Sequence, residues 1–273
     1  MENKKLLYIS QEIAPYLPDS PLALFGRDLP QKVQEKGFEV RTFMPKYGCI
    51  NERRNQLHEV IRLSGMNIII DDSDHPLIIK VATLQPSRMQ VYFIDNDDYF
   101  QRAGAKELET VSSPGDNDER MMFFARGIIE TVKKLRWDPA VIHCTGWIST
   151  LVPMYVKRMY HDDPALAKSK IVYSLRSEKF DGTLDARLGE KLRMLQFTDE
   201  DLAALGDTPA DCTALNKLAI MHSDAVVVSS PDVDPALVDF ARSISKPVLE
   251  YPGEEDFAEK YAEFYKTLVN GGE

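Results

Sequence analysis

Short apolar runs alternate with helix-like segments along most of this 273-residue chain, and this alternation restricts the fold more than any single motif does. The first unit is the run "KLLYIS" at 5–10, a helix predicted over about 22–36, and a second strand at 38–44. Such alternation is typical of a mostly parallel sheet covered by helices. Further strands are predicted at 140–145, 170–175, 225–230 and 247–251, and further helices at 117–135, 150–160, 212–222, 234–244 and about 254–268.

Two parts of the chain depart from this pattern. Residues 58–96 contain short β-rich segments separated by polar turns, which predicts β-hairpins added to the domain. Residues 176–211 are polar and predict a long loop. Because the chain is long enough for one sizeable core and has no low-complexity linker, we expect a single domain over 1–273, closed by the helix at about 254–268.

The composition argues against several classes of function. The formal charge of -10 and the lack of a basic stripe disfavour a nucleic-acid partner. No apolar run approaches the ~20 residues of a membrane span, and the N-terminus shows no secretory segment, so we expect a cytoplasmic protein with no membrane partner. Cysteines and histidines are scattered without CxxC or HxxxH spacing, and no P-loop or GxSxG motif occurs. We therefore expect no metal and no cofactor.

The loop after the first strand lacks a feature of many nucleotide-binding α/β domains. A glycine-rich loop at this point lets the backbone approach a phosphate at the start of the next helix. Here the first glycine is Gly26, and prolines occupy positions 15, 18 and 21. Ser20 is predicted to cap the helix, with Pro21 at the first helical position, where a missing N–H costs nothing.

Three stretches resemble a known family. They are "LLYISQEIAPY" followed by "DLPQKVQEKGFEVRTFMPKYG", then "DNDERMMFFARGIIETVKKLRWDPAVIHCTGWISTLVPMYVK", and finally "LNKLAIMHSDAVVVSSP". In order and approximate spacing they resemble the N-terminal domain of bacterial glycogen and plant starch synthases, glycosyltransferase family 5. The resemblance covers about residues 5 to 231. It implies one half of a GT-B architecture, a Rossmann-like sheet with helices on both faces. We expect the C-terminal half, which binds most of the ADP-glucose in that family, to be missing.

The family's phosphate and sugar motifs are only partly present. Its first loop carries a lysine and paired glycines, and its HxHDWH motif falls on 143–148. Positions that depart from these motifs are Pro18, Ser20, Pro21, Thr145, Gly146 and Ile148. The resemblance implies ligand contacts for the positions that still match, which are Glu12, Asp116, Asn117, Arg120, His143 and Trp147. We also expect Arg176 and Arg120 to hold an anion near the carboxyl edge of the sheet, where open α/β sheets place ligands. No catalytic residue is assigned.

The departing positions are mainly those that would touch phosphate or sugar. We therefore favour a synthase-like domain that is not catalytic alone and binds α-glucan, or a partner protein of glycogen metabolism, through the acceptor face and the 58–96 hairpins. The alternative is an enzyme, in which this chain is the acceptor-side subunit of a split ADP-glucose-dependent synthase. A third hypothesis is an unrelated ligand or an oligomeric scaffold.

Overall fold

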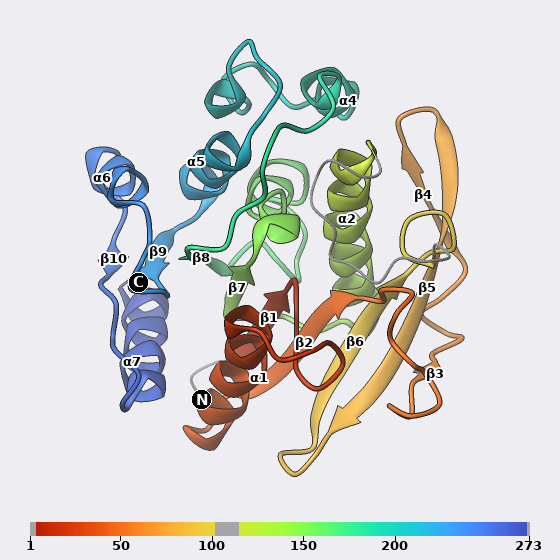
Figure 1. Ribbon diagram of the computed structural model, residues 1–273, viewed down its shortest axis with the longest axis vertical. Helices are drawn as coiled ribbons and strands as arrows, with labels where there is room; N and C mark the ends of the chain where they lie inside the picture. Colours follow the sequence, from red (N-terminus) through yellow and green to blue (C-terminus); the bar gives the residue numbers. More distant parts are fainter. Residues whose placement is uncertain (1–3, 102–114, 272–273) are drawn as a thin grey trace.

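One large mixed sheet runs through the computed structural model, which describes residues 4–101 and 115–271 (Figure 1). The strand order is β10-β9-β8-β7-β1-β2-β6-β5-β3, and β4 pairs with β5. The strands are β1 (Lys5–Ser10), β2 (Glu39–Pro45), β3 (His58–Glu59), β4 (Met66–Ile70), β5 (Ser73–Leu84), β6 (Met89–Asp95), β7 (Val141–Thr145), β8 (Lys170–Leu175), β9 (Ala225–Val228) and β10 (Val248–Leu249).

All strands from β10 to β6 along this order run parallel, which confirms the predicted mostly parallel sheet. Strand β1 lies near the middle, with Leu6 opposite Val40 of β2 on one side and opposite Val141 of β7 on the other. Following the chain, the sheet first extends from β1 to β2 on one side of β1. It later extends from β7 to β10 on the other side of β1. Open α/β sheets bind ligands at the carboxyl ends of the strands where the order reverses in this way.

Helices cover both faces of the sheet. They are α1 (Pro21–Glu35), α2 (Asn117–Leu135), α3 (Val152–Met154), α4 (Leu188–Met194), α5 (Cys212–His222), α6 (Pro235–Ser243) and α7 (Phe257–Asn270). Helices α1 and α7 contact each other on one face (Figure 1). On the other face α3 contacts α5, and α5 contacts α6, as right-handed crossovers between parallel strands require.

The β-rich segment 58–96 forms the predicted hairpins, but its last strand is an integral part of the parallel sheet. Strand β5 pairs antiparallel with both β4 and β6, whereas β6 pairs parallel with β2, from Arg41 opposite Gln90 to Pro45 opposite Ile94. The expectation of hairpins merely added to the domain was therefore incomplete. Local patterning cannot show that β6 has a parallel partner earlier in the chain.

The expectation of one long loop over 176–211 was wrong. This segment contains α4 and a 3-10 turn at Ala203–Leu205. Lys191 of α4 is buried, and its ammonium lies 2.8 Å from a carboxylate oxygen of Asp118 and 2.6 Å from one of Glu119, both in the first turn of α2. Burial opposes the charge, but hydrogen bonds to these two carboxylates raise the pKa of Lys191. The ion pairs fix α4 against α2.

Helix α7 completes the core on the α1 face. Tyr261 and Tyr265, one turn apart, are fully buried together with Ala262, so this helix seals the sheet much as predicted for 254–268. Among the residues that the structure describes, no helix is long and apolar enough to cross a membrane. Within the same residues, no group of three or more side chains is placed to bind a metal ion.

Candidate functional site

A small cavity lies at the carboxyl ends of β1, β7 and β8, where the strand order reverses. We call it the edge cavity; its volume is about 170 Å³. It brings together three of the predicted ligand residues, Glu12, Trp147 and Arg176. The complete lining is Gln11, Glu12, Leu22, Gly146, Trp147, Arg176, Glu178, Lys179 and Phe180.

The first loop uses its polar groups internally. The Ser20 hydroxyl accepts a hydrogen bond from the Ala23 N–H at 2.9 Å, which confirms it as the cap of α1. The same hydroxyl donates to a carboxylate oxygen of Glu12 at 2.6 Å. Burial raises the pKa of Glu12, although the hydrogen bond from Ser20 opposes this. Pro18 and Pro21 are exposed beside this pair, and Pro21 has no N–H with which to bind an anion.

Helix α1 approaches this loop closely enough to require Gly26. A Cβ atom on Gly26 would lie 2.1 Å from the carbonyl oxygen of Glu12. Gly26 thus allows two segments of the protein to pack closely, whereas the glycines of a phosphate loop allow the backbone to approach a ligand.

The turn after β7 also requires its glycine for packing. Gly146 has φ of +87°, and a Cβ atom there would lie 2.5 Å from the Cβ of Gln11. Its neighbours Thr145 and Ile148 are buried, so neither presents its side chain to a ligand. Trp147 lines the edge cavity and packs edge-on against Phe180, with ring centroids 5.5 Å apart.

Arg176 is the central cation at this edge, and its charge is paired within the protein. Its guanidinium donates two hydrogen bonds to the carboxylate of Glu178, at 2.8 and 2.7 Å, and a third to the carbonyl of Ser229 at 3.0 Å. It also lies over the ring of Phe25, 4.8 Å from the ring centre. Bidentate pairing of this kind is among the strongest that side chains form. Glu178 thus neutralises the positive charge that would attract an anion to this edge.

His143 lies in the core of the domain. The side chain is fully buried in β7, and its two ring nitrogens hydrogen bond to the hydroxyls of Tyr265 and Ser174. Burial lowers the pKa of His143 from 6.5 to about 3, so the ring is neutral at physiological pH. In this structure His143 is a core residue and lines neither the edge cavity nor the larger pocket described below.

The predicted residues of α2 form a separate group. Arg120 donates a hydrogen bond to the side-chain amide oxygen (Oδ1) of Asn117 at 2.8 Å and lies over the ring of Phe100. Asn117 and Arg120 are buried, and Asp116 precedes them at the helix cap. None of the three lines the edge cavity. Their role in ligand binding stays a prediction.

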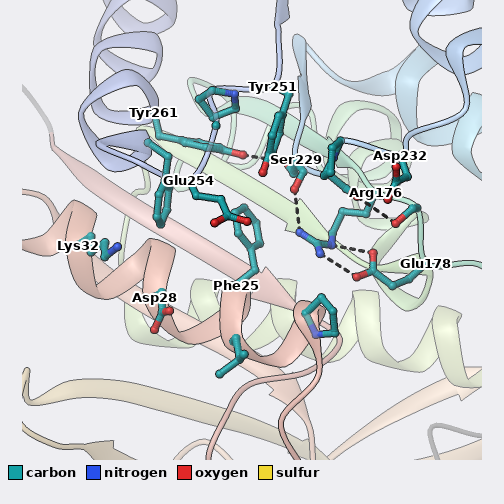
Figure 2. Close-up of a pocket in the computed structure, with 18 residues that line it drawn as sticks. Phe25, Asp28, Lys32, Arg176, Glu178, Ser229, Asp232, Tyr251, Glu254 and Tyr261 are labelled. Atoms are coloured by element: carbon teal, nitrogen blue, oxygen red, sulfur yellow. Dashed lines mark hydrogen bonds and ion pairs between the residues drawn. The ribbon is translucent and has the colours of Figure 1, made fainter.

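A larger pocket adjoins the edge cavity between α1, α7 and the ends of β8, β9 and β10 (Figure 2). We call it the helix pocket; its volume is about 770 Å³. Arg176 and Glu178 line both spaces. The lining comprises Pro21, Leu24, Phe25, Asp28, Lys32, Arg176, Ser177, Glu178, Ser229, Ser230, Pro231, Asp232, Tyr251, Pro252, Gly253, Glu254, Phe257 and Tyr261.

Sequence reasoning missed most of the helix pocket. Ser229, Asp232 and Tyr251 follow the last two strands of the sheet, which were themselves predicted. The rule that ligands bind beyond the carboxyl ends of parallel strands could have singled them out. The contribution of α1 and α7 could not be found this way, because it depends on how the two helices pack.

The fold defines the class, a Rossmann-like α/β domain with two cavities at the carboxyl ends of its parallel strands. The family model of the starch synthase catalytic domain matches residues 5–239. The chain therefore belongs to the starch synthase catalytic domain family, and it corresponds to the N-terminal domain of that family.

Individual relatives agree with this assignment. Glycogen synthase from Chlorobium luteolum is 37% identical over 191 residues, which are 70% of this chain and 39% of the relative. Glycogen synthase from Chlorobaculum parvum is 34% identical over 230 residues, which are 84% of this chain and 46% of the relative. The chain thus spans less than half the length of either curated relative.

A solved structure supports the fold. The catalytic domain of starch synthase IV from Arabidopsis thaliana, bound to ADP and acarbose, matches with a TM-score of 0.73 at 19% sequence identity. The match covers 92% of this chain and 51% of that one. The predicted single half of a two-domain architecture is thereby confirmed.

Proposed function

We propose that these 273 residues form a glycogen/starch synthase-like domain that binds α-glucan and does not transfer glucose on its own. The observation that carries this proposal is the pairing of Arg176 with Glu178 at the edge of the sheet. Around it, the first loop offers a proline at position 21, where an amide donor would be needed, and the Ser20 hydroxyl is engaged by Glu12 and the helix backbone.

This arrangement is poorly suited to a nucleotide sugar. Glucosyl transfer from ADP-glucose requires fixed cations and N–H donors that stabilise the charge of the departing diphosphate, and losing one such donor costs about 10²–10³ in rate. The edge cavity instead pairs its cation Arg176 with Glu178, adds the carboxylate of Glu12, and has Lys179 at its exposed rim. A neutral glucan has no charge that these carboxylates would repel.

Calorimetry with maltoheptaose and with ADP-glucose tests the proposal. We expect maltoheptaose to bind, ADP-glucose to show no micromolar affinity, and an assay with labelled ADP-glucose and glycogen to show no transfer. Measurable transfer, or micromolar binding of ADP-glucose, would overturn the non-catalytic assignment. Failure of every maltooligosaccharide to bind would overturn the glucan assignment.

The second candidate function is that of the acceptor-side subunit of a split synthase. The matched region of the chain covers 39% and 46% of two glycogen synthases. A separate polypeptide would then supply the nucleotide half, and that polypeptide would be its glycogen-metabolism partner. Pull-down from the native cell, followed by a transfer assay with the captured partner added, tests this function. A domain that is captured alone, and stays inactive when the C-terminal half of a relative is added, would rule it out.

A further inference from the structure

The segment 176–211 connects the edge cavity to α4. Its residues 178–180 line the edge cavity, and the chain then continues into α4, which lies beside the start of α2 (Figure 1). Lys191 attaches α4 to the first turn of α2, as described above. The exposed Arg187 donates two hydrogen bonds to Asp71, in the turn between β4 and β5, at 3.0 and 3.2 Å. The placement of α4 therefore depends in part on charged side chains.

A chain of hydrogen-bonding groups leads from Lys191 to His75 in the first part of β5. Lys191 donates to one carboxylate oxygen of Glu119 at 2.6 Å, and the hydroxyl of Tyr99 lies 3.0 Å from the other oxygen. The same hydroxyl lies 3.0 Å from Nε2 of His75. Nδ1 of His75 lies 3.2 Å from a carboxylate oxygen of Asp98. The chain thus connects the β4–β5 hairpin, the loop after β6, α2 and α4.

This chain needs one proton more than its groups supply while the imidazole is neutral. Three contacts, from Asp98 to His75, on to Tyr99, and from there to Glu119, each need one proton between the two polar atoms. Tyr99 supplies one of them, and burial raises its pKa, so the phenol keeps this proton. A neutral imidazole supplies the second. One contact then places two lone pairs face to face, unless His75 takes up another proton.

His75 is the group that can take up the third proton. A proton on Glu119 would remove the negative charge that pairs with Lys191. The carboxylate of Asp98 is 67% exposed to water, whereas the side chain of His75 is 12% exposed and packs on the ring of Tyr99. Within the described residues, the titratable and charged groups that face His75 and Tyr99 from neighbouring elements are Asp98, Asp116, Asp118, Glu119 and Lys191. Histidine is the residue type whose charge ordinarily changes between pH 5 and 8.

We propose that His75 is a proton-operated latch for the segment 176–211. When its imidazole has taken a second proton from the solvent, it donates to both Asp98 and Tyr99, and Tyr99 donates to Glu119. When the second proton is lost, Nδ1 and the carboxylate of Asp98 present lone pairs to each other and move apart. Tyr99 and Glu119 are then held less firmly, and the attachment of α4 to α2 is weakened. The latch needs no bound ligand, so its test is independent of the proposed function.

NMR and hydrogen exchange on the whole chain test the latch together. Nitrogen NMR of histidine-labelled protein counts the protons on the ring of His75 between pH 5.5 and 8, and His75→Ala identifies its signals. Amide exchange in α4 and in the first turn of α2 is compared with the intrinsic rate at each pH. We expect exchange to be about fivefold slower at pH 5.5 than at pH 8, the effect of one ordinary hydrogen bond. Proton uptake and slower exchange should occur over the same pH range.

Two variants change the chain in opposite ways. Asp98→Asn supplies the missing proton, because its amide can donate to Nδ1 of a neutral His75 while Nε2–H donates to Tyr99. We expect α4 to exchange slowly at both pH values in this variant. Tyr99→Phe breaks the chain at its centre and should leave exchange in α4 fast at both. His58→Asn, at an exposed histidine of β3, is the matched control and should keep the wild-type pH dependence.

The pH dependence of exchange in α4 decides whether the latch exists. Equal protection at pH 5.5 and 8 in the wild type would reject it, and so would wild-type pH dependence in both Asp98→Asn and Tyr99→Phe. If protection changed with pH over a range in which His75 kept the same number of protons, His75 would not be the sensor. Coincident proton uptake and protection, with the pH dependence lost in both variants, supports the latch. Thermal unfolding at pH 8 shows that each variant is folded.

Discussion

At the scale of single residues, His143 shows how a buried polar side chain can stabilise the junction between a sheet and a helix. Its imidazole lies in the central strand β7 and hydrogen bonds to Ser174 of β8 and Tyr265 of α7. Since the ring is sealed from water, the protein can hold it only in its neutral form. The consequence is a stability that depends on pH.

Stability should fall as the medium becomes acidic. The pKa of His143 drops from 6.5 to about 3 on folding, so between these values the unfolded chain binds a proton that the folded chain does not. The free energy of unfolding should therefore decrease below about pH 6.5, by up to about 1.4 kcal/mol per pH unit from this residue. Urea unfolding at pH 7, 6 and 5 measures the slope.

A His143→Asn variant is the necessary comparison, because burial also lowers the pKa of His222. The variant should be less stable at pH 7 and should show a shallower slope between pH 6.5 and 5. If the free energy of unfolding changed equally with pH in the wild type and in the variant, His143 would not be the source of the pH dependence.

Gly146 provides a second prediction at this scale. Gly146→Ala should lower the free energy of unfolding by about 2 kcal/mol or more, because it combines a left-handed backbone with a Cβ only 2.5 Å from Gln11. Gly182→Ala is a matched control. Gly182 has φ of +85° with nothing within 4 Å of the added Cβ, so only the backbone term of about 1–2 kcal/mol applies. Equal losses in chemical denaturation would show that the contact with Gln11 relaxes.

At the scale of elements, α4 depends on one buried ion pair. Lys191→Met should cost about 3–5 kcal/mol, because it leaves the carboxylate of Asp118 buried without its cation. Lys168→Met, at an exposed position, should change stability by less than about 0.5 kcal/mol. Hydrogen exchange of α4 and of the start of α2 should rise only in the first variant. Unchanged protection there would show that the ion pair does not fix α4.

The elements differ in how far the sequence predicts them. The strands β1, β2, β7 and β8 were predicted within about a residue, because buried parallel strands are short apolar runs bounded by polar residues. Helix α4 has only seven residues and depends on Lys191 meeting α2, which no local pattern reveals. The parallel pairing of β6 with β2 is non-local for the same reason.

The candidate site shows the same division between local and non-local information. The cap at Ser20 and the loss of a phosphate loop could be inferred from residue types alone. Of the positions that match the family motifs, Glu12 and Trp147 line one cavity, whereas His143 packs inside the core. A match to a family motif shows only where a residue lies in the fold. Whether the side chain faces a ligand depends on what covers it, and here α7 covers His143.

At the scale of the whole molecule, helix α7 closes the core of the domain on the α1 face. A chain that ends at Glu254 would lose the burial of Tyr261 and Tyr265, each contributing about 1.5–3 kcal/mol. That sum is a large share of the 5–15 kcal/mol by which domains are stable. We expect the truncated chain to melt at a much lower temperature or to aggregate. Removing only residues 271–273 should have little effect on the melting temperature. Equal melting temperatures for the full chain, this shorter truncation and the chain ending at Glu254 would show that α7 is dispensable.

The pairing of Arg176 with Glu178 has a consequence for how this domain could change. The charge of Arg176 is neutralised by Glu178, two positions away, but the guanidinium is still present. Glu178→Gln would leave the guanidinium of Arg176 without its carboxylate partner. This guanidinium lines both the edge cavity and the helix pocket, and it could then bind inorganic phosphate. At this position, a single substitution separates a paired arginine from one whose guanidinium can bind phosphate.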